Sequence, residues 1–362
     1  MIKFPFKLTS KKCLGIDIGI SSIKVVELSR GRKNILENYG EIETKFLYQR
    51  SLGTLGETPL LLSSQAIARA ILSVLEAAEI KTKKAIFSIP DFSSFFTNFV
   101  LPPMAKEEIP EAVRFEARQH IPLPLSAVTL DWQIIQRGVA KEEKGVKILL
   151  VAVSNEIIHQ YRKIAEYANL ELLALEAEVF GLLRSSVSAE DEKKVISIVD
   201  IGARSTTCSI IDSKNLKVSH SFDISGNQLT EILAKSLVID YKTAEEIKQK
   251  YGIVPCPEFS KEDPLRVRKI LLPLIDLIGA EIENTAQNFY QKEGKKIEKL
   301  ILAGGTALLP GLKEHLSETL SLKIEIADPF SKLSSNPVLS QTLKKMGPSY
   351  AIAVGMALRE FD

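Results

Sequence analysis

The chain has 362 residues, of which 47 are basic and 45 are acidic, so its net charge at pH 7 is +2. A charge so close to zero creates no strong field for binding nucleic acid. The length exceeds the usual size of a single core and predicts two domains or two related halves. Cys13, Cys208 and Cys256 lack CxxC spacing, which argues against a zinc site or a disulfide framework.

No apolar stretch reaches the roughly 18 residues that span a bilayer, and the first residues lack a signal-peptide core. We therefore expect a cytoplasmic protein in a reducing compartment. The first twelve residues carry Lys3, Lys7, Lys11 and Lys12 without any acidic residue. This segment could touch an anionic membrane surface, although a solubilising tail is the simpler interpretation.

Two segments, 14–28 and 196–211, repeat one pattern of strand, tight polar turn and strand half a chain apart. Each first strand carries an aspartate near its end, Asp17 or Asp200. The β-branched flanks predict hairpins, and the small turn residues let the backbone curl around an anion. Two such hairpins, one per half, can face each other and hold a polyphosphate with its magnesium ion.

The hairpins supply most of the residues that we expect to bind this ligand. Asp17 and Asp200 are the candidate metal residues, each by orienting a metal-bound water, and the turn glycines let backbone amides approach phosphate oxygens. The candidate phosphate-side residues are Gly19, Ser21, Ser22, Lys24, Gly202, Ser205 and Thr206.

Two later segments add candidate contacts. Gly226 precedes a helical stretch in which Glu245 and Lys248 lie one turn apart, so the pair could grip one ligand or could form a solvated salt bridge. An apolar strand then runs into a Gly-Gly turn, where a flat base can lie against bare backbone. This turn contains Gly304, Gly305 and Thr306.

With these elements in order, the chain resembles the actin-like ATPase superfamily. Residues 17–22 and 200–206 of the chain resemble the two phosphate loops of this superfamily, and residues 303–311 resemble its adenosine motif. The resemblance implies ATP and Mg²⁺ as ligands and an α/β fold of the actin/Hsp70 type, with two duplicated lobes around a nucleotide cleft. Residues 222–226 and 244–248 resemble the ribose-side segment.

Residues 175–181 resemble the helix that connects the two lobes of this superfamily. Glu178 stands there at a position where the superfamily often has an acidic residue near the magnesium-bound water. The resemblance therefore makes Glu178 the candidate catalytic residue. A solvated helix carboxylate is the alternative interpretation.

Within the superfamily, the chain is most similar to the PilM family of type IV pilus assembly, which is itself similar to the division protein FtsA. The distinguishing segments are 14–19, 88–91, 121–122, 130–132, 327–330 and 350–359. The resemblance implies a cytoplasmic ATP-binding scaffold, peripheral to the inner membrane, that binds the N-terminal tail of a PilN-like membrane protein. Contacts with other pilus proteins and self-association are also expected.

Two departures from that family lie in the phosphate loops. Ile20 replaces a serine, which removes one phosphate contact, and Arg204 stands where a small or polar residue is usual. Arg204 could pair with a phosphate or point to solvent, which leaves ATP hydrolysis uncertain.

Two other functions on the same fold are an FtsA-like division anchor and a small-molecule kinase. No motif supplies the base that a kinase needs, and the chain stops at Asp362 without the linker and amphipathic helix of FtsA-like anchors. Slow ATP hydrolysis is compatible with the scaffold.

The pattern of elements predicts four units. Residues 1–90 with 171–194 form the first core lobe, and 91–170 form an FtsA-like inserted α/β subdomain. Residues 195–226 with 300–362 form the second core lobe, and 227–299 form a helical insertion. The inserted subdomain has an unusual density of aromatic residues, which could be pockets for a peptide or ordinary core: Phe92, Phe95, Phe96 and Phe99.

Overall fold

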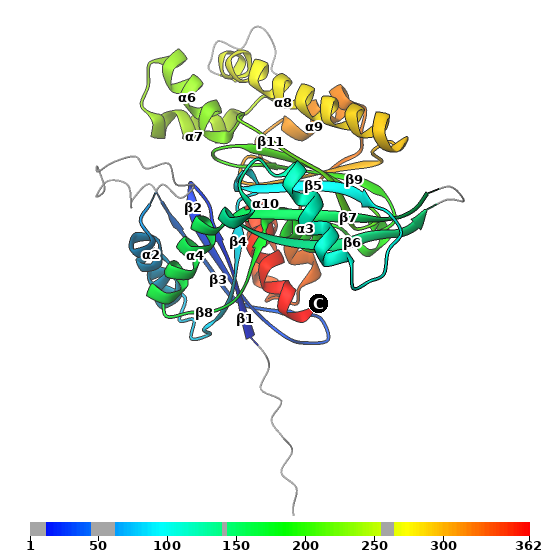
Figure 1. The fold of residues 1–362 in the computed structure, drawn as a ribbon. Helices are drawn as coiled ribbons and strands as arrows, with labels where there is room; N and C mark the ends of the chain where they lie inside the picture. Colours follow the sequence, from blue (N-terminus) through cyan, green and yellow to red (C-terminus); the bar gives the residue numbers. More distant parts are fainter. Residues whose placement is uncertain (1–11, 45–61, 140–142, 255–263) are drawn as a thin grey trace, which may run out of the picture.

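The computed structural model describes residues 12–44, 62–139, 143–254 and 264–362 (Figure 1). Lys3, Lys7 and Lys11 of the basic segment, and also Cys256, lie outside these ranges. In the described part of the chain, no helix is both long and apolar enough to cross a bilayer. The strands form two five-stranded sheets and one three-stranded sheet.

The first sheet has the strand order β3-β2-β1-β4-β8. Strands β1 to β3 form an antiparallel meander, whereas β4 runs parallel to β1 and β8 runs parallel to β4. The bounds are β1 Lys12–Ile18, β2 Ser22–Ser29, β3 Ile35–Glu43, β4 Lys84–Ile89 and β8 Glu171–Ala177.

The second sheet repeats this topology, with the order β11-β10-β9-β12-β13. Its antiparallel meander is again followed by two parallel strands. The bounds are β9 Val195–Ile201, β10 Thr206–Asp212, β11 Asn215–Phe222, β12 Lys299–Ala303 and β13 Ile324–Ile326. The predicted α/β duplication is therefore confirmed at the level of strand order and direction.

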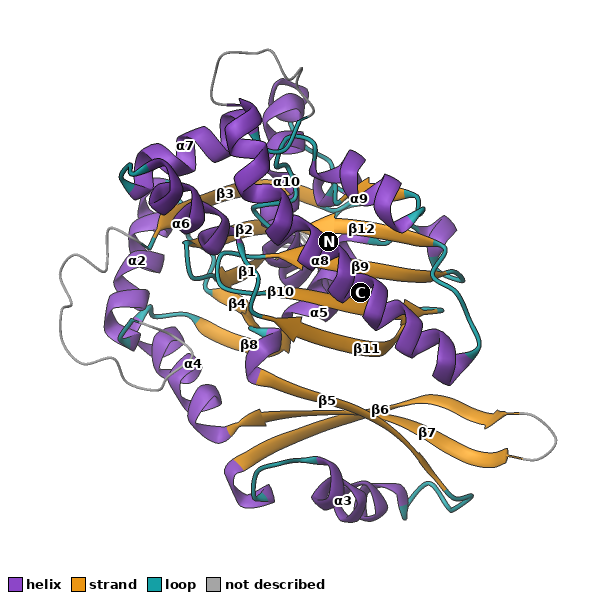
Figure 2. Cartoon of the chain, turned by 90° about the horizontal axis from the view of Figure 1, so that it is seen from above, coloured by secondary structure: helices purple, strands orange, loops and turns teal. Residues whose placement is uncertain are grey.

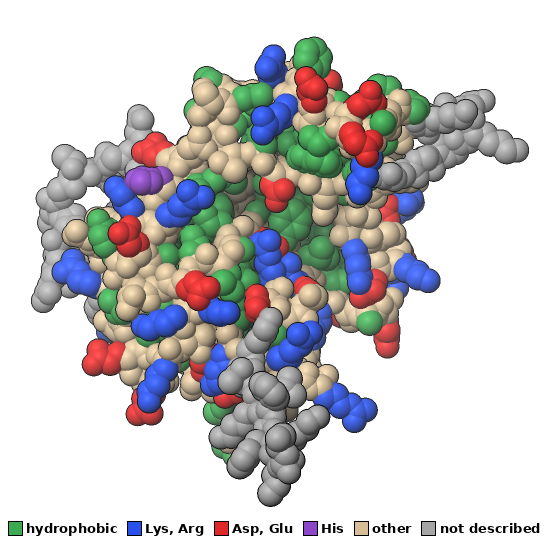
Figure 3. Space-filling model, turned by 60° about the horizontal axis from the view of Figure 1, so that its bottom comes forward, with side chains coloured by type: hydrophobic (Ala, Val, Ile, Leu, Met, Phe, Trp, Pro, Cys, Tyr) green, Lys and Arg blue, Asp and Glu red, His purple; other side chains and the backbone are tan. Residues whose placement is uncertain are grey.

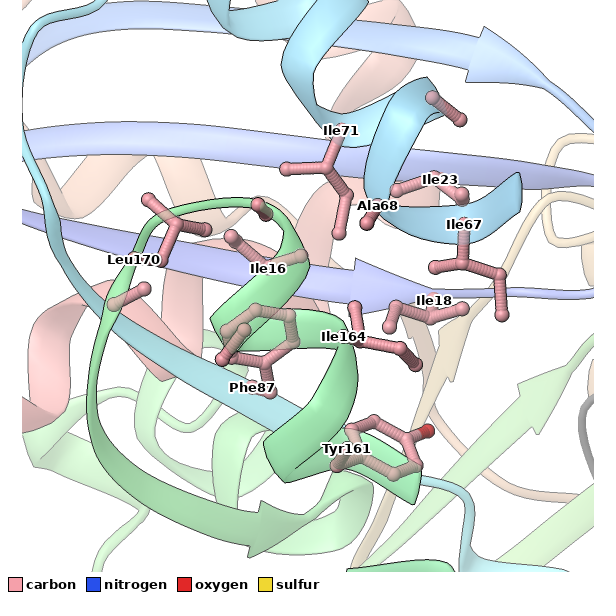
Figure 4. Close-up of a cluster of buried hydrophobic side chains, with 14 of the residues drawn as sticks. Ile16, Ile18, Ile23, Ile67, Ala68, Ile71, Phe87, Tyr161, Ile164 and Leu170 are labelled. Atoms are coloured by element: carbon pink, nitrogen blue, oxygen red, sulfur yellow. The ribbon is translucent and has the colours of Figure 1, made fainter. Parts of the chain in front are cut away.

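Helices α2 (Ser64–Ala77) and α4 (Asn155–Tyr167) cover one face of the first sheet (Figure 4). Their apolar sides meet the strands around Ile16 and Phe87, and the ring of Phe87 packs edge-on against Tyr161 at a centroid distance of 6.3 Å. Helix α4 belongs to the range 91–170 that we expect to form the inserted subdomain. Its buried side chains instead join the core of the first sheet.

Helices α5 (Glu178–Ser186) and α10 (Ser340–Leu358) pack together beside β1. Glycines permit this close approach. A Cβ atom on Gly15 would lie 1.9 Å from the carbonyl oxygen of Ala353, and one on Gly355 would lie 2.0 Å from that of Gly181. Helix α10 therefore lies against the first sheet, although it belongs to the range that we expect to form the second lobe.

The three-stranded sheet has the order β5-β7-β6, with α3 against one face (Figure 2). Its elements are β5 Ser94–Leu101, α3 Ile109–His120, β6 Val128–Val139 and β7 Glu143–Ser154. Phe95 and Phe99 pack toward α3, whereas the ring of Phe96 contacts Phe180 on α5. The predicted aromatic cluster is therefore divided between the two faces of β5.

A helical layer covers the second sheet (Figures 1 and 2). It consists of α6 Gly226–Leu237, α7 Tyr241–Tyr251, α8 Pro264–Glu293 and α9 Leu312–Leu320. Helix α8 continues through Pro273. Short 3-10 turns are η1 Asp91–Ser93, η2 Leu125–Ala127, η3 Ala189–Asp191, η4 Pro329–Lys332, η5 Pro337–Leu339 and η6 Arg359–Phe361. On the face shown in Figure 3, acidic and basic side chains are interspersed, as the small net charge predicts.

A buried ion pair attaches η3, in the segment that leads into the second lobe, to β12. The carboxylate of Asp191 lies 2.6 Å from Nζ of Lys299 and 2.7 Å from Nζ of Lys194, and it accepts a hydrogen bond from Ser188. The two lysines hold the pKa of this carboxyl well below its usual range. An aspartate with a lowered pKa stabilises the fold above its ordinary pKa, and this contribution is lost as the pH falls through the folded-state pKa.

We expect Asp191→Asn to lower the free energy of unfolding by about 2 kcal/mol, because the buried ammonium of Lys299 loses one of its two carboxylate partners and keeps only Glu325. The difference from the parent should be constant between about pH 5 and 8. It should shrink progressively below about pH 4, where the unfolded parent gains a proton that the folded carboxylate still lacks. Urea unfolding across this range measures it. The exposed pair of Glu192 and Lys214 is the control, since Glu192→Gln should cost under about 0.5 kcal/mol. Equal costs for the two variants would contradict the buried pair's role.

Candidate functional site

The two hairpin turns that carry Asp17 and Asp200 have the same backbone geometry. The amide of Gly19 donates to the carbonyl of Ser22 at 3.1 Å, and the amide of Gly202 donates to that of Ser205 at 3.0 Å. In the sheet registers, Asp17 lies opposite Lys24 and Asp200 lies opposite Thr207. The internal repeat in the sequence therefore extends to the hydrogen bonds of the two turns.

Four carboxyl groups gather near the ends of the central strands. Asp17 lies near the end of β1, Asp91 follows β4, Glu178 follows β8 and Asp200 lies near the end of β9. Because β1, β4 and β8 are parallel, their carboxyl ends meet at one edge of the first sheet. Asp17 raises the pKa of Asp200, which shows that the carboxyl groups of the two lobes lie near each other here.

Two hydrogen bonds connect Asp91 with the first residues of α5. The amide of Asp91 donates to Oε2 of Glu178 at 3.2 Å, and the amide of Val179 donates to Oδ1 of Asp91 at 3.2 Å. The second bond satisfies a free amide in the first turn of α5. Asp17 is also anchored, because its Oδ1 accepts a 2.8 Å hydrogen bond from the Ser88 hydroxyl.

Burial raises the pKa values of all four groups, and neighbouring carboxylates add to the rise for Asp91, Glu178 and Asp200. The pKa of Asp91 rises to about 8, mainly through burial with a further contribution from Asp200, and the pKa of Asp200 rises to about 7 through burial and Asp17. Burial and the neighbouring carboxylates hold the pKa of Glu178 well above its usual range, and burial also raises that of Asp17. A cation at this position would be strongly favoured.

Lys24 is the positive side chain that opposes this charge. Only 9% of its surface is exposed, its Nζ donates to the hydroxyl of Ser22 at 2.8 Å, and its charge lowers the pKa values of both Asp17 and Asp200. Two buried atoms nearby have no hydrogen-bond partner among the described residues: Oδ2 of Asp91 and the Tyr161 hydroxyl. Such atoms are rare in folded proteins, and a bound water or ion is one kind of partner that satisfies them.

Loops of the second lobe complete the site. The amide of Gly226 donates to the carbonyl of Gly202 at 2.9 Å, and a Cβ atom on Gly226 would lie 2.5 Å from Oγ1 of Thr306. Gly304 has φ +88° and packs directly on Oδ1 of Asp200. Gly305 differs, because no atom lies within 4 Å of the Cβ that it lacks. Its bare backbone therefore borders open space.

Lys248 is directed into the protein. Its side chain is buried, and its Nζ donates to the carbonyl of Gly226 at 3.0 Å, to Thr230 at 2.8 Å and to Glu245 at 2.7 Å. These bonds hold α7 against the first turn of α6. Glu245 keeps part of its carboxylate exposed, with a relative side-chain accessibility of 31%.

The remaining candidates differ in orientation. Thr206 is buried and its hydroxyl donates to the carbonyl of Ile224 at 2.6 Å, so it connects elements of the second lobe. Ser21 is exposed and Ser205 is half-buried at the two turns. Asp91 and Tyr161 were not among the expected site residues. The position of Asp91 directly after a strand parallel to β1 is the signal that could have found it.

Among the described residues, no group of three or more His, Cys, Asp or Glu side chains is arranged to hold a metal ion by itself. Asp17 and Asp200 fit a magnesium ion only as part of a shell completed by water and a polyphosphate. The raised pKa values, the two unpartnered buried oxygens and the bare backbone of Gly305 are compatible with such a group.

The duplicated sheets, with an aspartate-bearing hairpin at the centre of each, define the actin-like ATPase fold. The chain matches the model of the family "Type IV pilus assembly protein PilM" over residues 15–361, and it belongs to that family. The expected membership is thereby confirmed.

Three relatives illustrate the range of similarity. A chain of the solved PilM-PilN type IV pilus biogenesis complex is 26% identical, with a TM-score of 0.82 and coverage of 97% of this chain and 98% of that one. MreB5 of Spiroplasma citri bound to AMPPNP shares the fold at 15% identity and a TM-score of 0.55, with coverage of 97% and 96%. The cell division protein FtsA of Enterococcus faecalis is 24% identical, over 91% of this chain and 81% of its own length.

Proposed function

We propose that this protein is a nucleotide-regulated scaffold of type IV pilus assembly. It binds ATP with Mg²⁺ between its lobes and, in the closed form, binds the N-terminal tail of a PilN-like inner-membrane protein from the cytoplasmic side. The observation that carries the nucleotide proposal is the pair of equivalent hairpin turns, which place Asp17 and Asp200 in one electrostatically coupled cluster. The partner proposal is supported by the similarity to a chain of the PilM-PilN complex.

In this proposal, each part of the nucleotide site has a role. The turns at Gly19 and Gly202 offer backbone amides to phosphate oxygens, and Lys24 provides the adjacent positive charge. Asp17 and Asp200 would hold water molecules of a magnesium ion, and this ion would supply the positive charge that neutralises the phosphates and polarises bound water. The open face of Gly305 receives the adenosine portion. Lys248 acts indirectly, by holding Gly226 in place.

The partner proposal can be tested with purified full-length protein and a synthetic PilN-like N-terminal tail. We expect the tail to bind more tightly in the presence of Mg²⁺ and a non-hydrolysable ATP analogue than without nucleotide, whereas a scrambled peptide of the same composition should not bind. Calorimetry measures both affinities. Binding of nucleotide without any binding of the tail would favour the second candidate function, an FtsA-like division anchor. The similarity to FtsA supports this alternative.

Glu178→Gln is expected to preserve nucleotide binding and to slow any ATP hydrolysis at least about tenfold. Glutamine keeps the size of the side chain and its bond to the amide of Asp91. It cannot take up the negative charge that a bound magnesium ion would favour at this carboxyl despite its raised pKa. Tail binding should persist or strengthen, because the ATP-bound form lasts longer. A single-turnover assay beside the tail-binding assay tests both expectations. Hydrolysis at the parental rate would make Glu178 a structural carboxylate.

A further inference from the structure

Arg204 connects the turn of the second hairpin to the inserted sheet. It lies on the short loop between β9 and β10, and its guanidinium carbon is 4.8 Å from the centre of the Phe92 ring. Phe92 belongs to η1, which leads from β4 into β5. Within the described residues, Arg204 forms no ion pair with a carboxylate. The contact therefore joins the second lobe to the start of the inserted subdomain without neutralising the arginine.

The chemistry of this contact leaves the arginine able to bind an anion. Stacking on an aromatic ring uses the flat face of the guanidinium group, whereas its five N–H donors point outward in the plane of the group. Arg204 belongs to the same short loop as Gly202 and Ser205, where we place the phosphates, so these donors start within reach of that position. One side chain can therefore contact Phe92 and a phosphate at the same time.

Phe92 is itself held at a junction. The preceding Asp91 is bonded to the start of α5 through the amide of Val179. Two residues after Phe92, β5 begins, and its Asn98 side chain donates to the carbonyl of Lys217 on β11 at 2.8 Å. The inserted sheet is thus attached to both lobes close to its first strand, so a shift of one lobe against the other must act on β5.

We propose that Arg204 couples the nucleotide site to the inserted sheet: its guanidinium face is held on Phe92, and its N–H edge binds the nucleotide phosphates. This inference rests on the proposed nucleotide-binding function and adds the means by which bound nucleotide orders β5. Because the two contacts share one rigid group, phosphate binding immobilises the arginine and strengthens its stacking on Phe92. By linkage, the ring of Phe92 should also raise the affinity for nucleotide.

Three variants of the full-length protein separate these contacts. Arg204→Ala removes both, Arg204→Lys keeps the charge without the planar stack, and Phe92→Leu removes the ring but keeps an apolar side chain. The exposed Arg32, in the turn after β2, is the matched control as Arg32→Ala. Calorimetry with Mg-ATP gives the affinity, and hydrogen exchange with and without Mg-ATP gives the protection of amides in 94–101.

In the parent and the Arg32 control, we expect Mg-ATP to slow exchange in 94–101 about tenfold. Arg204→Ala should bind Mg-ATP about tenfold more weakly, and at saturating nucleotide it should lose the protection. Phe92→Leu and Arg204→Lys should lose most of the protection while the affinity falls only about twofold to threefold.

The outcomes distinguish the two levels of the proposal. If the parent binds Mg-ATP and Phe92→Leu keeps the full protection of 94–101, the coupling is overturned and the nucleotide-binding function stands. The same holds if Arg204→Ala behaves like the Arg32 control. If the parent fails to bind Mg-ATP at all, the proposed function fails and the coupling fails with it.

Discussion

Alanine at Asp17 or at Asp200 should weaken the binding of Mg-ATP at least about a hundredfold, which corresponds to about 2.7 kcal/mol. Each aspartate comes from the hairpin of a different lobe, and the two interact electrostatically. Loss of either one removes a carboxylate that orients magnesium-bound water on its own side of the phosphates. Calorimetry with Mg-ATP measures the loss, and the exposed Asp131→Ala is the control.

The same substitutions should leave the fold intact. Asp17 is 5% exposed, and burial together with its acidic neighbours makes its negative charge unfavourable in the folded protein. Removing it relieves an unfavourable burial of charge that Lys24 and the bond from Ser88 only partly offset. We therefore expect the free energy of unfolding without ligand to fall by less than about 1 kcal/mol. A variant that loses binding because it unfolds would not support the assignment.

The parental affinity should also depend on pH. Because burial and Asp17 raise the pKa of Asp200 to about 7, this carboxyl carries a proton in much of the ligand-free protein at neutral pH. Magnesium favours the ionised form, so Mg-ATP should bind more tightly as the pH rises from 6 to 8. Affinity that is constant over this range, or unchanged in both alanine variants, would contradict the cluster as the magnesium side of the site.

Valine at Gly305 should reduce the affinity for Mg-ATP about a hundredfold while the protein stays folded. No protein atom lies within 4 Å of the added Cβ, and the backbone is outside the positive φ region, so the side chain extends into the open space beside the loop. If adenosine lies there, valine excludes it, and the phosphate contacts cannot compensate for a misplaced base. The melting temperature should change by less than about 3 °C.

Gly304 is unsuitable for the same experiment. Its φ is +88°, and a Cβ would lie 2.5 Å from Oδ1 of Asp200, so Gly304→Val would disturb the carboxylate cluster whether or not adenosine binds beside it. Gly305→Ala is the better companion, because its single methyl group should give an intermediate loss. A folded Gly305→Val protein with parental affinity would mean that the adenosine lies elsewhere.

The sequence by itself determined the duplicated hairpins, because their information is local. β-branched strands flank turns of small residues, and the aspartates hold the same place near the end of each first strand, so the repeat was visible without any long-range contact. The strand order of the two sheets, the actin-like fold and the family membership agree with that prediction. The residues proposed to touch nucleotide and magnesium remain predictions.

Only the tertiary structure decided which distant residues meet. The amide of Asp91 donates a hydrogen bond to Glu178 because β4 and β8 are parallel neighbours. Lys248 donates a hydrogen bond to the carbonyl of Gly226 because α7 packs on α6. Arg204 lies on Phe92, more than a hundred residues away in the chain. Such contacts depend on strand register and on the packing of helices, which a short stretch of sequence does not encode.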